Sequence, residues 1–169
     1  IIAGAVATLP LHIKRRVDDR TRLDASDLAL WQVLRRRPNP WQKPAQFRRM
    51  LQAHVLLSGN GYARIVRDAR GDVQQLLPLH PGRVEVRQRD DLALEFVYTR
   101  KNGGQQIFQQ RDMLHLVGLT LDGITGVTPI KYARETIGLA MAQEAHGANV
   151  FRNGGVMSSI LKHPGQLGE

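Results

Sequence analysis

Residues 44–66, PAQFRRMLQAHVLLSGNGYARIV, decide the fold because they contain a helix, its end and the strand that follows. Pro44 suits the first turn of a helix, where a missing N–H costs nothing. Apolar residues then recur at helical spacing: Phe47, Met50, Leu51 and Val55. Gly59-Asn60-Gly61 is typical of a glycine-terminated helix end. The sequence therefore predicts a helix that passes directly into a strand over residues 62–66.

Downstream of this segment the sequence is rich in short strands. Alternating apolar and polar residues predict strands over 83–87 and 94–98, each with one buried face. Turn signals at residues 68–72 and at Asn102-Gly103 favour hairpins. Further short strands are expected over residues 73–77, 106–109 and 113–117. Together they predict a small antiparallel or mixed sheet.

Upstream, the sequence predicts two helices and one strand. Residues 1–9 read as a helix that Pro10 ends, and residues 11–17 as a short strand. Asp24 or Ser26 is expected to cap a second helix that runs to about Arg37. Its predicted buried stripe has three members: Leu28, Trp31 and Leu34.

Residues 118–128 form a loop rich in Gly and Thr, and the longest helix signal follows over residues 129–152. Thr128 is expected to cap this helix, Pro129 to occupy its first turn and Asn153-Gly154-Gly155 to end it. A strand is expected over residues 156–161. The fold class predicted is therefore α+β, a small sheet with packed helices followed by one long helix.

The composition is that of a globular protein with an uneven positive charge. The chain has 169 residues, a net charge of +9 and no cysteine, which excludes disulfides and thiolate chemistry. Residues 1–60 carry +7, in three clusters: Lys14-Arg15-Arg16, Arg35-Arg36-Arg37 and Arg48-Arg49. A basic DNA-binding module is thus one alternative. Solvated faces or contacts to an acidic subunit are the other, and we favour them because no aromatic residue is interleaved within the clusters.

The motifs of enzymes are incomplete in this sequence. Residues 118–125 have the glycine spacing of a phosphate-binding loop, but Ile124 stands where its lysine is required. No histidine lies within 16 residues of another, and no serine lies in a hydrolase elbow. Asp90-Asp91 reads as a solvated turn and His54 as a packed core histidine. We expect no enzyme activity, no cofactor and no metal site.

Five segments in order along the chain resemble the portal protein of long-tailed bacteriophages. They are residues 6–12 (VATLPLH); 37–40 with Phe47 and 54–63 (HVLLSGNGYA); 77–84 (LPLHPGRV); 114–140, with LHL at 114, GLTLDG at 118 and GVTPI at 126; and 151–165, beginning FRNGG. The chains of that family are much longer. For that reason, and because both ends of the sequence read like the middle of a longer chain, we expect it to be an N-terminal part of such a protein.

The resemblance implies a structural protein of the virion, made in the host cytoplasm. It implies a dodecameric ring at the capsid vertex, with a wing over residues 1–128, a stem helix over 129–153 and the start of a clip over 154–169. The implied partners are the large terminase packaging motor, capsid and head–tail connector proteins, and double-stranded DNA that passes non-specifically through the channel; no membrane is implied. Channel or subunit-interface candidates lie on the long helix: Lys131, Arg134, Glu135 and Glu144.

Overall fold

The computed structural model describes residues 1–154, which fall into two units, Ile1–Lys131 and the residues from Tyr132 onward. Within residues 1–154, every strand belongs to the first unit and all the strand pairs are antiparallel. The predicted α+β class is confirmed, with the sheet antiparallel rather than mixed. The helices of the first unit are α1 (Ile2–Thr8), α2 (Ala29–Arg35) and α3 (Pro44–Ser58), with 3₁₀ turns at Pro81–Arg83 and Gln110–Asp112. The strands are β1 (Lys14–Arg16), β2 (Arg22–Asp24), β3 (Asn60–Arg67), β4 (Val73–Leu79), β5 (Val84–Gln88), β6 (Leu94–Thr99), β7 (Gln105–Gln109) and β8 (Met113–Val117).

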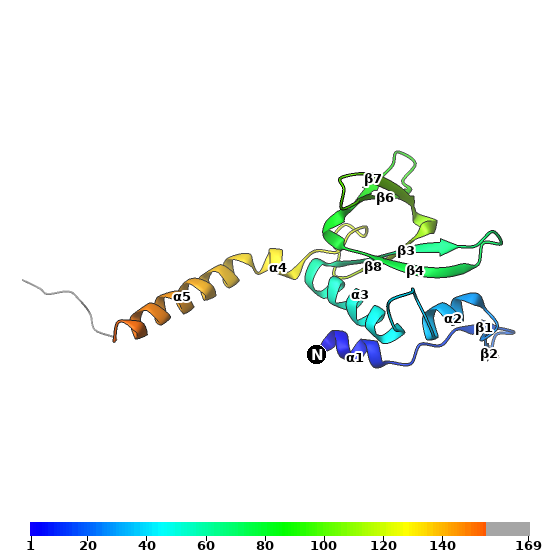
Figure 1. Ribbon diagram of the computed structural model, residues 1–169, viewed down its shortest axis with the longest axis horizontal. Coiled ribbons are helices and arrows are strands. Elements are labelled where there is room, and N and C mark those ends of the chain that lie inside the picture. Colours follow the sequence, from blue (N-terminus) through cyan, green and yellow to red (C-terminus); the bar gives the residue numbers. More distant parts are fainter. Residues whose placement is uncertain (155–169) are drawn as a thin grey trace, which may run out of the picture. The chain divides into compact units, whose positions relative to one another are not determined.

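The first unit is built in layers around the sheet β4-β3-β8. Helices α2 and α3 lie against one face of this sheet, and the second sheet, β5-β6-β7, lies on its other side (Figure 1). The central strand β3 pairs with β4 on one edge and with β8 on the other. Each layer therefore depends on the position of β3.

Neighbouring residues of β3 contribute to two different cores. Ala63 is fully buried on the helix side. Its cluster contains residues of α2, α3 and β4: Val33, Phe47, Leu51 and Leu76. Tyr62 points to the other side, between the two sheets. Its cluster contains Leu79, Phe96, Phe108 and Met113. Because side chains alternate across a strand, one strand joins both cores.

The helix-to-strand segment forms as the sequence predicts. Helix α3 begins at Pro44 and ends at Gly59, whose φ of 76° lies in the left-handed region that favours glycine. Phe47 and Leu51 are its buried residues. The predicted hairpin at residues 68–72 also forms, since the Asp68 carboxylate accepts the backbone N–H groups of Arg70 and Asp72, each at 2.9 Å.

The prediction for α2 was wrong in its start and only partly right in its buried stripe, of which Leu34 packs against the core. The helix begins only after Leu28, and neither Asp24 nor Ser26 caps it. Leu28 is 39% exposed, while Val33 is the buried residue. Asp24 instead ends β2, a strand that the sequence analysis missed. Its side chain forms an ion pair with Lys14 on β1, at 2.6 Å.

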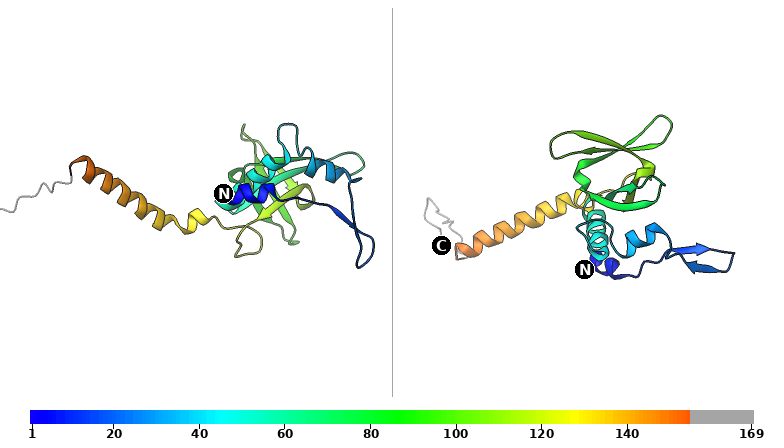
Figure 2. Two further views of the ribbon diagram at one scale, coloured as in Figure 1. Left: turned by 90° about the horizontal axis from the view of Figure 1, so that it is seen from below. Right: turned by 45° about the vertical axis from the view of Figure 1, so that its right-hand side comes forward.

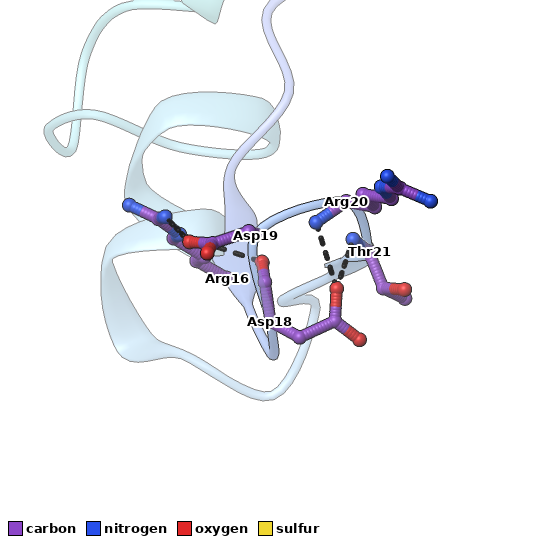
Figure 3. A network of polar contacts seen from close by, with 5 residues as sticks. All are labelled: Arg16, Asp18, Asp19, Arg20 and Thr21. Carbon is purple, nitrogen blue, oxygen red and sulfur yellow. Dashed lines mark hydrogen bonds and ion pairs between the residues drawn. The ribbon is translucent and has the colours of Figure 1, made fainter.

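Strands β1 and β2 form a hairpin whose residues are all exposed, and it extends away from the rest of the first unit (Figure 2). Figure 3 shows its turn, where one oxygen of Asp18 accepts the N–H groups of Arg20 and Thr21 at 2.8 and 2.6 Å. These backbone donors lower the pKa of Asp18. Asp19 forms an ion pair with Arg16 beside the turn. The hairpin is thus shaped by local polar contacts rather than by a core.

The long helix predicted over residues 129–152 is interrupted. It consists of α4 (Pro129–Tyr132) and α5 (Arg134–Arg152), separated at Ala133, where the backbone (φ −90°, ψ 9°) departs from the helix. Thr128 acts as the predicted cap, because its Oγ1 accepts the Lys131 N–H at 3.3 Å. A turn at Asn153 and Gly154 ends α5, as predicted. The strand predicted over 156–161 lies outside the described residues.

We predict that Phe96→Ala lowers the free energy of unfolding by about 3–5 kcal/mol, because Phe96 is 1% exposed and fills the core between the sheets. Ile107→Ala on the adjacent strand is the matched control, since Ile107 is 60% exposed. Urea unfolding of the 169-residue chain, followed by tryptophan fluorescence, measures both. Equal effects of the two substitutions would contradict a core between the sheets.

Candidate functional site

No catalytic or metal-binding constellation is present in the described part of the chain. In residues 1–154, no three His, Asp or Glu side chains gather closely enough to hold a metal ion. The candidate carboxylates Asp90 and Asp91 lie in an exposed turn, as predicted. No helix of this part is long and apolar enough to cross a bilayer.

The glycine-rich loop at residues 118–125 uses its own carboxylate where a phosphate loop would bind a ligand. Asp122 accepts the N–H groups of Ile124 and Thr125, each at 2.8 Å, and the hydroxyl groups of Thr120 and Thr125. These donors hold the pKa of Asp122 well below its usual range. Since the amides are already satisfied, the loop is closed by Asp122 and offers them to no phosphate.

The best-built polar site is a junction around Asn60, at the start of β3. Its amide nitrogen donates to the Gly126 carbonyl at 2.8 Å, and its amide oxygen accepts the Gly126 N–H at 2.8 Å. The same oxygen contacts His115 Nε2 on β8, at 2.9 Å. Asn60 is buried, so these bonds satisfy a side chain that would otherwise be costly to bury. They tie a loop residue to a strand 66 positions earlier.

Glycines at positions 118 and 126 let the backbone on either side of the loop approach Gly59 closely. The Gly118 N–H donates to the Gly59 carbonyl at 2.8 Å. A Cβ on residue 126 would lie 1.9 Å from the Gly59 oxygen, a distance that no side chain can occupy. The requirement for glycine at 126 therefore comes from close packing rather than from backbone torsion.

His115 completes the junction as a neutral donor. Its ring stacks on Tyr62 at 4.6 Å and meets the edge of Phe96 at 5.4 Å. Because the Asn60 oxygen can only accept, His115 must carry its proton on Nε2. Burial lowers the pKa of His115 and raises the pKa of Tyr62 to about 12. Both groups are thus uncharged at neutral pH.

The junction therefore fixes the loop that leads to α4 and contains no nucleophile with a matching base. An open hollow of about 520 Å³ lies beside it. Its lining comes from the α3–β3 connection, from β5 and from the loop: Leu57, Ser58, Asn60, Tyr62, Pro81, Gly82, Val84, Val86, Thr125, Gly126, Thr128 and Ile130. Seven of these twelve residues are apolar or glycine, so the hollow suits packing better than chemistry.

Sequence analysis did not single out Asn60 or His115 as partners. The available signal was weak, a polar residue between two glycines at a helix end. His54, which was predicted to pack in the core, is half-buried beside His80, with ring centroids 5.8 Å apart. Burial is the main cause that lowers the pKa of His54, and His80 adds to it.

The four predicted channel or interface residues are all exposed: Lys131, Arg134, Glu135 and Glu144. None of them forms an ion pair within residues 1–154. Lys131 lies on α4, and the other three lie on α5. Their role stays a prediction.

The three basic clusters differ in what their side chains contact. Lys14, Arg15 and Arg16 each pair with an aspartate of the same hairpin region, which neutralises the first cluster. Arg48 donates to the Ala7 carbonyl at the end of α1, at 2.6 Å. The guanidinium groups of Arg35 and Arg36 each lie 5.8 Å from the ring centre of Trp31. An aromatic residue therefore lies beside the second cluster in space, although none is interleaved with it in the sequence.

We predict that Gly126→Ala destabilises the first unit by at least about 2 kcal/mol, because the added Cβ forces apart the bonds at Gly59 and Asn60. Gly138→Ala in α5 is the control, since nothing lies within 4 Å of its Cβ. That change should leave the urea midpoint unchanged and raise helicity in circular dichroism. A midpoint unchanged by Gly126→Ala would contradict the close approach.

We predict that the first unit loses stability as the pH falls below 6.5, the ordinary pKa of histidine. The folded-state pKa of His115 is lowered, so the unfolded chain takes up a proton first, and the stabilisation present above pH 6.5 declines below it. His54 acts in the same direction. His115→Gln keeps a donor for Asn60 and should make the decline of unfolding free energy between pH 7.5 and 5.5 shallower. An unchanged slope would contradict the assignment.

Comparisons of the sequence with known proteins point to one family. The sequence model of the phage portal protein family matches residues 1–169. The portal protein of Enterobacteria phage HK97 is 30% identical over 164 residues, which is 95% of this chain and 38% of that protein. The chain thus spans less than half the length of this relative.

Two solved structures share the fold. One is a chain from the neck of an empty gene transfer agent (GTA) particle, computed with C6 symmetry. It has a TM-score of 0.73 and 24% identity, and the match covers 96% of this chain and 42% of that one. A chain from the neck of a native GTA particle, computed with C12 symmetry, has a TM-score of 0.70 and 24% identity, covering 89% and 39%. Because the family model matches its whole length, the chain belongs to the phage portal protein family.

Proposed function

We propose that the chain is part of a portal ring at a capsid vertex, which forms the channel for packaging and ejection of DNA. Membership of the portal family supports the assembly role. The observation that carries the proposal is helix α5, which has 19 residues and not one buried residue among them. Most helical stability in proteins comes from tertiary packing, so a helix with no packed face requires partners to cover it.

The apolar residues of α5 favour a ring because they lie on two faces. Ile137 and Met141 share one face, four residues apart, and Phe151 extends it. Leu139 and Val150 lie about 200° around the helix from Ile137. All five are exposed. A subunit in a closed ring contacts one neighbour on each side through different surfaces, which two apolar faces satisfy.

In this proposal the first part of the chain is the wing and the helical part is the stem. The wing comprises residues 1–128, the stem 129–153, and the clip begins in 154–169. The ring is dodecameric, which agrees with the C12 symmetry of the neck that contains a chain of the same fold. Lys131, Arg134, Glu135 and Glu144 then face the channel or a neighbouring subunit.

The proposed partners follow from that position. The large terminase packaging motor docks on the ring, capsid and head–tail connector proteins surround it, and double-stranded DNA passes through it without sequence preference. The role is one of assembly and geometry, with no catalysis by the chain. Its place is the portal vertex of the virion, after assembly in the host cytoplasm.

We predict that Met141→Asp and Leu139→Asp, made singly in the complete gene product, each reduce the fraction of rings at least tenfold, because each buries a charge in a subunit contact. Mass photometry and negative-stain microscopy measure the rings. Asn149→Asp is the control, since it adds the same charge about 120° around the helix from Ile137. Circular dichroism shows whether each variant is folded. Rings that form equally well in all three variants would contradict the proposal.

A further inference from the structure

Most of the net charge of the chain comes from one continuous stretch of sequence. Residues 28–67 contain no Asp or Glu, and they carry +8 of the net +9. The eight cations are Arg35, Arg36, Arg37, Lys43, Arg48, Arg49, Arg64 and Arg67. An acid-free stretch of this length concentrates positive potential on the elements that it forms, which are α2, α3, the loop between them and β3.

Three of these cations surround a hollow with an exposed indole. Arg36, Arg37 and Lys43 line an open hollow of about 460 Å³, together with Trp41 and three neighbours: Pro40, Gln42 and Gln46. Trp41 is 64% exposed. No carboxylate of residues 1–154 forms an ion pair with any of the three cations. The hollow therefore presents positive charge and a planar aromatic surface together.

A buried side chain holds the loop that carries Trp41 in place. Asn39 is 1% exposed, and its amide oxygen accepts the N–H groups of Gln42 and Trp41 at 2.9 and 3.3 Å. Its amide nitrogen donates to the Leu76 carbonyl on β4, at 3.1 Å. Arg37 closes the loop by donating to the Pro40 carbonyl at 2.8 Å. The indole is thus presented on a rigid support, so little order is lost when a ligand binds.

We propose that this hollow binds nucleic acid, with the backbone phosphates on Arg36, Arg37 and Lys43 and an unpaired base stacked on Trp41. A guanidinium group has five N–H donors, so Arg37 keeps free donors for a phosphate beside its bond to Pro40. A base has a planar face that matches an indole, and such stacking tolerates any sequence. An acidic peptide would satisfy the cations and leave the indole without a matching surface, so nucleic acid fits the whole hollow better.

The site goes beyond the proposed portal function. DNA that moves through a ring channel requires neither tight binding nor stacking of its bases. This hollow instead combines cations for phosphates with an indole for a base, on a fixed loop. Loss of binding at the hollow would leave ring formation through α5 intact. Failure of either proposal is thus distinguishable from failure of the other.

The test uses two triple variants that remove the same charge from different places. Arg36→Gln/Arg37→Gln/Lys43→Gln removes the cations of the hollow, and Lys14→Gln/Arg15→Gln/Arg16→Gln removes cations that are paired with aspartates. Fluorescence anisotropy measures binding to labelled oligothymidylate about 15 nucleotides long, to a duplex of the same length and to polyglutamate, over a range of salt concentrations. Trp41→Ala and Trp41→Phe test the stacking.

The hollow variant should weaken single-strand binding at least tenfold and reduce the slope of log Kd against log salt by about 2, at roughly 0.7 per lost phosphate contact. The paired-cation variant should have a much smaller effect. Trp41→Ala should weaken single-strand binding about tenfold and duplex binding less, with partial recovery in Trp41→Phe. Because these side chains are exposed, the urea midpoints should not change.

Three results would overturn the proposal. Equal losses in the two triple variants would mean that binding follows diffuse net charge. Single-strand binding that is unchanged by Trp41→Ala would rule out a base stacked on Trp41. Tighter binding of polyglutamate than of oligothymidylate would assign the hollow to an acidic protein segment.

Discussion

The first unit depends on a strand whose two faces are buried in different cores. Residues Asn60, Gly61, Tyr62 and Ala63 of β3 are all buried, with α2 and α3 on one side and the second sheet on the other. A shift of one residue would exchange the positions of the Tyr62 ring and the Ala63 methyl. Neither core could accept the exchange, because interiors are close-packed. The register of β3 is therefore fixed from both sides, and β4, β8 and both outer layers take their positions from it.

The polar junction extends this fixed position to a loop that has little core of its own. Asn60 is the first residue of β3, so the position of the strand also fixes the position of its amide group. Its two bonds to Gly126 then place the loop before α4, and the bond with His115 holds the amide in one orientation. Loss of one partner would leave buried polar groups unsatisfied, which is more costly than the net gain from any single bond. The junction thus acts as a unit.

The parts of the fold that the sequence predicts well are those decided by neighbouring residues. The start of α3 at Pro44, its end at Gly59 and the turn at Asn102-Gly103 all follow from local backbone preferences. The partners of Asn60 lie 55 and 66 residues away, and no local pattern indicates them. The partners of the charged clusters are likewise not indicated by any local pattern. The clusters at 14–16 and 35–37 look alike in the sequence, but within residues 1–154 only the first forms ion pairs with carboxylates.

Helix α5 differs from the rest of the described chain in having no core of its own. The first unit has two cores of buried apolar residues, whereas α5 has helical sequence preferences and no buried residue. Its glycines, Gly138 and Gly147, weaken an isolated helix, yet they would allow the close approach of a neighbouring helix. A sequence selected for a lone solvent-exposed helix would instead carry polar residues around its whole surface. The apolar residues on α5 are therefore best explained by contacts that the single chain does not contain.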